Sequence, residues 1–143
     1  MSRQAGRRRR TFESVENAFE RFREKQVFSQ WSDDVLRLYV EHGTVEQDDG
    51  QRTLVWSPEW ESFYYSTPYI DIWQRLPEFD ALKIPTLIIT GETSDIYTPE
   101  SRRTLRNLVP SATYHTIAGH GHLFPHSAPQ KTAQLMREWL DTL

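Results

Sequence analysis

The stretch IPTLIITGETSDIYTPES, residues 84–101, decides the expected fold class of this chain. Its apolar run, residues 86–90, is continuous rather than alternating, and Gly91 follows directly. Continuous apolarity is typical of a strand that is covered on both faces, as in a parallel sheet. Thr98 and Pro99 then give the order of cap and proline that begins a helix. The stretch therefore predicts a strand, a loop and a helix of an α/β protein.

Residues 112–130, ATYHTIAGHGHLFPHSAPQ, continue the same alternation. Residues 113–117 predict a second short strand, and a loop rich in glycine and histidine follows it. Ser127 with Gln130 fits a capping box at the start of a final helix, on which Met136, Leu140 and Leu143 recur on one face. Residues 84–143 thus predict the order strand, helix, strand, helix.

The preceding residues are expected to be mostly helical and rich in aromatic side chains. Helices are predicted after Ser14, Ser32 and Ser57, each of which can cap a helix start, and again in residues 69–76. Asp49-Gly50 predicts a turn between the segments 44–47 and 52–56.

Composition excludes several classes of protein. The chain has 143 residues, of which 37% are hydrophobic, 26% charged and 13% aromatic, so a packed core is expected rather than disorder. The absence of cysteine excludes disulfides, cysteine-ligated zinc and thiol catalysis. No apolar run approaches the roughly 20 residues that span a bilayer, and none follows the basic N-terminus as in a signal peptide. We therefore expect a soluble, cytoplasmic protein that does not bind membranes.

The charge is distributed unevenly along the chain. The net charge is −3, yet residues 1–10 hold five arginines and no acid. Such a run can bind nucleic acid or serve as a localisation signal. We favour a solvated tail, or a basic segment that contacts an acidic surface of its own fold, because the acidic remainder would repel phosphate. No specific nucleic-acid partner is expected.

An acid and a histidine follow the two predicted strands in turn. Asp95 lies in the loop after the first strand, and His122 lies in the loop after the second. In open α/β sheets, ligands and catalytic groups collect on loops at the carboxyl ends of strands. An acid followed by a histidine is two thirds of a nucleophile–histidine–acid triad, in which the carboxylate orients the imidazole that activates the nucleophile.

These residues and their order resemble the end of the α/β-hydrolase fold. That family has an apolar strand, a glycine turn with the acid, a helix begun by proline, a strand, and then Gly-x-Gly-His. The resemblance covers residues 84–143, which it identifies as the C-terminal core segment. It implies that residues 11–83 form the cap (lid) segment, behind a basic N-terminal tail of residues 1–10. It implies no cofactor.

Carried over residue by residue, the resemblance gives Asp95 the role of the triad acid and His122 that of the base. His120 then fills the variable position of Gly-x-Gly-His. Many family members place the acid three residues after the glycine, whereas Asp95 lies four after Gly91, so Glu92 remains a second candidate for the acid. Asp95 as a helix cap and His122 as a structural buried histidine are the alternatives without chemistry.

The nucleophile of the family is missing from these residues. No Gly-x-Ser-x-Gly or Gly-x-Asp-x-Gly elbow occurs, and the oxyanion loop that precedes it is also missing. We therefore expect the C-terminal half of a hydrolase, either a truncated gene product or one half of a split enzyme, that is inactive alone. Its expected partners are a complementary N-terminal half or a second copy. The alternative is a non-catalytic binding or interaction module derived from the same fold.

Two further groups of side chains are candidates for binding. By resemblance, Trp56, Trp60, Tyr64 and Trp73 are candidates to bind a small apolar substrate, although such aromatic residues also build the core of a cap. Four histidines raise the possibility of a metal site, but they lack the carboxylate partners and helical spacing of zinc hydrolases. No metal is expected. The histidines are His115, His120, His122 and His126.

Overall fold

The computed structural model describes residues 8–67 and 71–143. The chain forms two compact units, Met1–Tyr69 and Ile70–Leu143. The division at residue 83 into cap and core rests on the family resemblance rather than on compactness, and it stays a prediction. Most of the basic tail, residues 1–7, lies outside the described residues.

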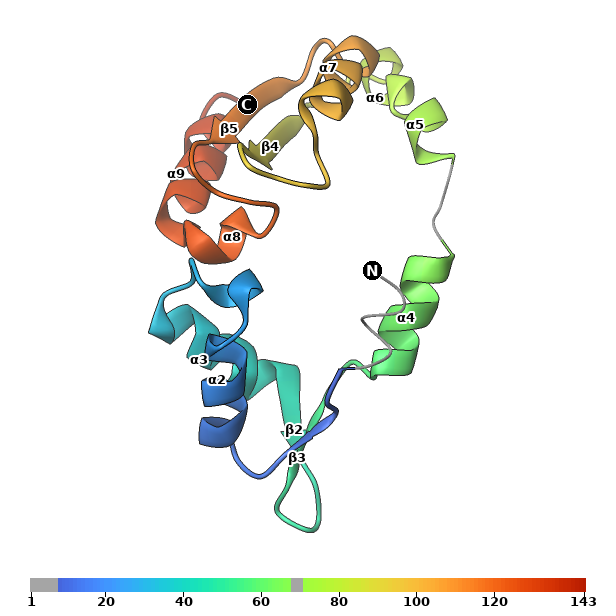
Figure 1. The fold of residues 1–143 in the computed structure, drawn as a ribbon. Helices are drawn as coiled ribbons and strands as arrows, with labels where there is room; N and C mark the ends of the chain where they lie inside the picture. Colours follow the sequence, from blue (N-terminus) through green and yellow to red (C-terminus); the bar gives the residue numbers. More distant parts are fainter. Residues whose placement is uncertain (1–7, 68–70) are drawn as a thin grey trace. The chain divides into compact units, whose positions relative to one another are not determined.

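The first unit combines helices with a small antiparallel sheet (Figure 1). Its helices begin where serine caps were expected, since Ser14, Ser32 and Ser57 each accept a backbone hydrogen bond from the first turn. The strand order is β1-β3-β2, with Thr44 opposite Leu54 and Thr11 opposite Thr53. The elements are β1 (Thr11–Phe12), α2 (Val15–Arg23), a 3₁₀ turn (Gln26–Phe28), α3 (Asp33–Gly43), β2 (Thr44–Glu46), β3 (Arg52–Leu54) and α4 (Pro58–Ser66).

Aromatic rings form the core of this unit. Phe22 is 1% exposed, and its ring lies 5.3 Å from that of Phe12 and 5.4 Å from that of Phe28. Trp31 packs edge-on against Phe28 at 4.9 Å. These distances are those of favourable edge-to-face and tilted aromatic pairs, which add to the free energy of apolar burial.

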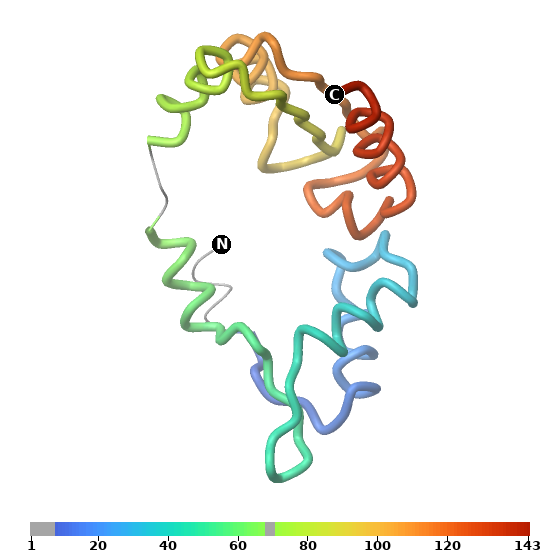
Figure 2. Tube along the Cα trace, turned by 180° about the vertical axis from the view of Figure 1, so that it is seen from behind, coloured from blue at the N-terminus to red at the C-terminus, as the bar shows by residue number. Residues whose placement is uncertain are grey.

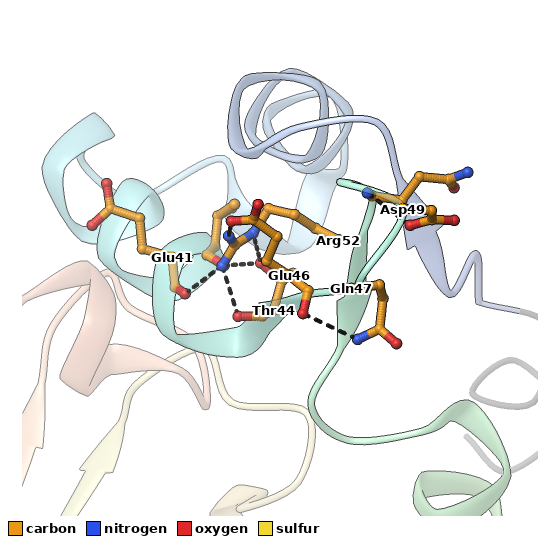
Figure 3. A network of polar contacts seen from close by, with 8 residues as sticks. Glu41, Thr44, Glu46, Gln47, Asp49 and Arg52 are labelled. Atoms are coloured by element: carbon orange, nitrogen blue, oxygen red, sulfur yellow. Dashed lines mark hydrogen bonds and ion pairs between the residues drawn. The ribbon is translucent and has the colours of Figure 1, made fainter.

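Arg52 joins the hairpin to the preceding helix (Figure 3). Its guanidinium donates to the backbone oxygens of Glu41 and Thr44 at 3.2 and 2.9 Å, and to Thr44 Oγ1 at 2.8 Å. Thr44 Oγ1 in turn donates to the Val40 carbonyl at 2.7 Å. Carbonyl groups at the end of α3 that lack a partner within the helix therefore accept hydrogen bonds from Arg52. Its positive charge also interacts favourably with the negative end of the helix dipole.

The second unit has the predicted order of strand, helix, strand and helix, preceded by two short helices. β4 and β5 are parallel neighbours with Leu87 opposite Thr113 and Gly91 opposite Ile117. In both views the red helix that ends near the C-terminus packs along this pair (Figure 1, Figure 2). The elements are α5 (Ile72–Arg75), α6 (Pro77–Ala81), β4 (Leu87–Gly91), α7 (Pro99–Leu108), β5 (Thr113–Ile117), α8 (Phe124–Ser127) and α9 (Pro129–Leu140).

One edge of β4 faces away from β5. Thr113 N–H donates to Thr86 O at 2.9 Å, and Glu92 N–H donates to Ile117 O at 3.0 Å. In a parallel ladder alternate residues bond to the same neighbour. The even-numbered residues of β4 therefore face β5, and the backbone groups of Leu87 and Ile89 point to the opposite edge. Within the described residues no third strand pairs there.

The start of the last helix corrects one expectation. Ser127 does not form a capping box with Gln130, because it ends the short helix α8 and its hydroxyl contacts His120. Ala128 precedes α9 without a side-chain cap, and Pro129 begins the helix. On α9 Leu135 is buried, whereas Met136 and Leu140 of the predicted apolar face are 49% and 56% exposed.

No helix in the described parts of the chain is long and apolar enough to cross a membrane.

Candidate active site

The candidate site is built on the loops that follow β4 and β5. Because the two strands are parallel and end opposite each other at Gly91 and Ile117, the chain leaves both at the same edge of the sheet. The backbone of one loop is bonded to the other, since Thr93 N–H donates to His120 O at 3.0 Å. The acid-bearing and histidine-bearing loops therefore form one surface.

Glycine at position 91 permits this close approach. A Cβ at Gly91 would lie 2.1 Å from the Gly121 carbonyl oxygen and 2.5 Å from that of His120. Both atoms belong to backbone, so a side chain could not be accommodated without moving the loops apart. Gly119 has φ +73°, a left-handed conformation that favours glycine, and it turns the second loop. Glycine is therefore required at position 91 by the close backbone contact and favoured at position 119 by its φ angle, whereas Gly121 has open space around it.

Asp95 and His122 are both exposed on this surface. The His122 ring lies 6.0 Å from the ring of Tyr97, which is two residues after Asp95. Within the described residues no hydrogen bond or ion pair joins the Asp95 carboxylate to the imidazole. Catalytic hydrogen bonds often tighten only when substrate is bound, so the pairing of the two side chains stays a prediction.

Polar residues close to Asp95 in the sequence accept hydrogen bonds from the backbone of the two loops. Glu92, the second candidate for the acid, accepts a hydrogen bond through Oε2 from Gly119 N–H at 2.8 Å. Ser94 is 8% exposed and accepts from the N–H groups of Ile96 and Tyr97 at 3.3 and 3.0 Å. Thr98 Oγ1 caps α7, so the alternative of Asp95 as the cap of this helix is wrong.

His120 and His126 make contacts outside the candidate acid and base. His120 Nδ1 lies 2.7 Å from Ser127 Oγ, which holds His120 toward α8. Burial lowers the pKa of His126 below its ordinary value, because the charged imidazolium is desolvated there. Among the described residues no group of three or more histidines and carboxylates is arranged to hold a metal ion.

The four predicted substrate-binding residues are divided between the units. Trp56 and Tyr64 line a cavity of about 340 Å³ in the first unit, at the low end of the size range of ligand sites. Trp60, also in that unit, is 63% exposed, and its ring contacts Phe63 at 5.7 Å. Trp73 lies on α5 of the second unit and is 38% exposed. The other residues that line the cavity are Arg8, Tyr39, Gly43, Leu54, Glu61 and Tyr65.

The cavity also holds an ion pair that no sequence motif indicates. Arg8 and Glu61 form a hydrogen-bonded ion pair with both side chains about a quarter exposed, at 26% and 24%. Burial would lower the pKa of Arg8, but the bond to Glu61 raises it above its ordinary value. At least one arginine of the basic run thus contacts an acid of its own fold, and the separation of 53 residues left no local signal.

Comparisons with known proteins give a consistent picture of the fold. An esterase from Mycobacterium tuberculosis is 18% identical, with a TM-score of 0.74 over 98% of this chain and 47% of that chain. A peroxisomal alpha-beta-hydrolase from Saccharomyces cerevisiae is 13% identical, with a TM-score of 0.78 over 97% of this chain and 38% of that chain. An alpha/beta hydrolase from Novosphingobium aromaticivorans is 26% identical, with a TM-score of 0.64 over 85% of this chain and 43% of that chain.

The chain has the fold of an α/β-hydrolase, in part. It spans less than half the length of each of these three structures. No family model matches the sequence, and no curated protein matches it. The α/β-hydrolase resemblance drawn from residues 84–143 is thus confirmed at the level of fold.

Proposed function

We propose that this chain supplies the cap, the acid and the base of a hydrolase that cleaves an ester or a related bond. In this proposal Asp95 is the acid and His122 the base of a nucleophile–histidine–acid triad. The supporting observation is the bonded pair of loops after β4 and β5, in which Thr93 N–H donates to His120 O at 3.0 Å. The similar structure from Mycobacterium tuberculosis is named an esterase, which favours an ester.

The two side chains would divide the proton chemistry. The Asp95 carboxylate would hold the His122 imidazole in one tautomer and stabilise the imidazolium. The imidazole would take the proton of the nucleophile and return it to the leaving group. Glu92 is the weaker choice for the acid, because its carboxylate already accepts a hydrogen bond from Gly119 N–H.

The nucleophile and the oxyanion donors would come from residues other than these 143, since no Gly-x-Ser-x-Gly elbow is among them. We therefore propose that the chain alone does not hydrolyse esters. The partner that completes it would carry the elbow, and a small apolar substrate would bind near the aromatic side chains of the cap.

A non-catalytic binding module is the second candidate. Its support is the lack of a hydrogen bond between Asp95 and His122 in the described structure, together with the missing elbow. The two proposals differ in what the coding DNA immediately upstream of Met1 contains. A truncated hydrolase requires an elbow there, in the same or a shifted frame, whereas a binding module does not.

The test reads that DNA and then expresses the upstream segment together with this chain. The joined protein should hydrolyse a p-nitrophenyl ester, and His122→Ala should lower kcat by roughly 10³-fold or more. His42→Ala is the matched control, because His42 is exposed on α3 in the first unit and should leave the rate unchanged. An upstream segment without an elbow would favour the binding module, and a His122→Ala protein with the full rate would contradict the hydrolase proposal.

A further inference from the structure

We infer that Glu92 is a positioning residue that holds the histidine loop in place for the pairing of His122 with Asp95. The inference rests on the proposed function. It gives Glu92 a task different from that of the acid, and it follows from contacts that all lie within the second unit.

The backbone of Glu92 is fixed on both sides. Its N–H donates to Ile117 O at 3.0 Å, which continues the ladder one residue beyond β4. Its carbonyl accepts from Arg102 Nη1 at 3.3 Å, and the same nitrogen donates to Gly91 O at 3.1 Å. Arg102 lies on α7, so the strand, the loop and the helix hold Glu92 together. Its side chain therefore starts from a defined position.

The side chain reaches across to the other loop. Glu92 Oε2 accepts from Gly119 N–H at 2.8 Å, a distance typical of a hydrogen bond assisted by charge. Gly119 has φ +73° and lies three residues before His122. The bond thus fixes the point at which the backbone turns toward the catalytic histidine.

The next residue of that loop is fixed as well. His120 accepts through its carbonyl from Thr93 N–H, and its ring contacts Ser127 Oγ at 2.7 Å. His122, by contrast, contacts the ring of Tyr97 at 6.0 Å and is exposed. Because this ring contact is weakly directional, the orientation of His122 depends on the backbone that Glu92 and Thr93 hold.

The experiment measures which ring nitrogen of His122 carries the proton, from ¹⁵N chemical shifts of the intact 143-residue chain. A carboxylate partner favours one tautomer, and a charge-assisted bond supports roughly a tenfold excess. Asp95→Asn should abolish that excess. Glu92→Ala should lower it to the same degree although Asp95 is intact, whereas Glu92→Gln, which keeps an acceptor oxygen for Gly119 N–H, should retain it.

A control separates positioning from general destabilisation. Leu105→Ala removes a buried side chain of α7 that is 6% exposed, and it should lower the melting temperature while leaving the tautomer ratio unchanged. If Glu92→Ala does not fold, Glu92→Asp, whose carboxylate is one methylene shorter, replaces it with the same expected loss.

The outcomes distinguish the two proposals. An Asp95→Asn effect without a Glu92→Ala effect would overturn the positioning role and leave the proposed function in place. The same loss of ratio in Leu105→Ala as in Glu92→Ala would also overturn the positioning role. A ratio that Asp95→Asn does not change would overturn the pairing of Asp95 with His122 in the chain without substrate, and the positioning role of Glu92 would fall with it.

Discussion

The two compact units differ in how completely each encloses its apolar side chains. The first unit holds most of the buried apolar residues in the described chain, with rings packed around Phe22. In the second unit the buried apolar residues are only Leu105, Val109, Ile117 and Leu135 among those described. Those of the first unit are Phe12, Ala18, Phe22, Phe28, Trp31, Leu36, Val40 and Leu54.

The unit with the larger apolar core is not the unit that carries the candidate acid and base. The candidate acid and base lie in the unit with the thinner core, on a sheet in which Leu87, Ile88 and Ile89 are only half-buried. Apolar burial contributes about 25 cal/mol per Å², so the exposed parts of these strands leave stabilisation unrealised. The second unit is therefore expected to depend on further chain, or on a second copy, more than the first unit does.

The largest effect should follow from opening the aromatic core. Phe22→Ala removes a ring that is 1% exposed, and it should lower the free energy of unfolding by about 3–5 kcal/mol. Amide hydrogen exchange should rise in residues 8–67 and change little in residues 71–143. Urea unfolding followed by circular dichroism measures the first quantity, and exchange mass spectrometry the second.

Phe63→Ala is the matched control for that experiment, because Phe63 is 58% exposed and its loss should change stability by less than about 0.5 kcal/mol. Equal acceleration of exchange in both units of the Phe22→Ala chain would show that they unfold together. The expectation that the core around Phe22 stabilises only the first unit would then be wrong.

Proline substitutions on the two edges of β4 should lower stability by an intermediate amount, and by more on the edge that pairs with β5. Ile88→Pro removes an N–H that points toward β5, and the lost ladder bond should lower stability by about 1–3 kcal/mol. Ile89→Pro is matched in side-chain change but removes an N–H on the opposite edge, so it should affect stability less. Exposed strand edges promote pairing between chains, and we expect Ile89→Pro to reduce self-association.

Thermal unfolding and sedimentation velocity measure the two consequences for these proline variants. An Ile89→Pro chain that is as destabilised as Ile88→Pro would contradict the assignment of the edges. Unchanged sedimentation of Ile89→Pro would argue against association through β4.

The smallest effects should come from helix caps, one in each unit. Ser14 Oγ accepts from Asn17 N–H at 3.0 Å at the start of α2, and Thr98 Oγ1 accepts from Ser101 N–H at 3.3 Å at the start of α7. Replacing either by alanine should lower stability by about 1 kcal/mol. Site-resolved amide exchange should rise only in the helix that has lost its cap, and a response in both units would show that the two units open together.

Local signals predicted much of the fold correctly. Ser14, Ser32, Ser57 and Thr98 each begin a helix as expected, because a side-chain oxygen followed by a helix-forming segment is a short-range property. The strand at residues 113–117 was predicted with the bounds that the structure gives it. The placement of the two site loops at one edge followed from parallel pairing of successive strands.

Long-range contacts were beyond the reach of such signals. The strand β1 has only two residues and exists because Thr11 pairs with Thr53, far along the chain. Ser127 has the spacing of a cap, but its hydroxyl contacts His120 instead. The bond from Gly119 N–H to Glu92 likewise joins residues that are 27 positions apart.

The parallel pairing of β4 and β5 also has a kinetic consequence. Residues 92–112, including α7, are all that separates the two strands, so the crossover closes a short loop. The entropy lost on closing a loop grows only with the logarithm of its length, and short crossovers form early relative to distant contacts. During synthesis Asp95 and His122 can thus be brought to one edge of the sheet by a single local folding event. The candidate acid and base would then reach the same edge of the sheet together, whether or not any nucleophile has yet been made.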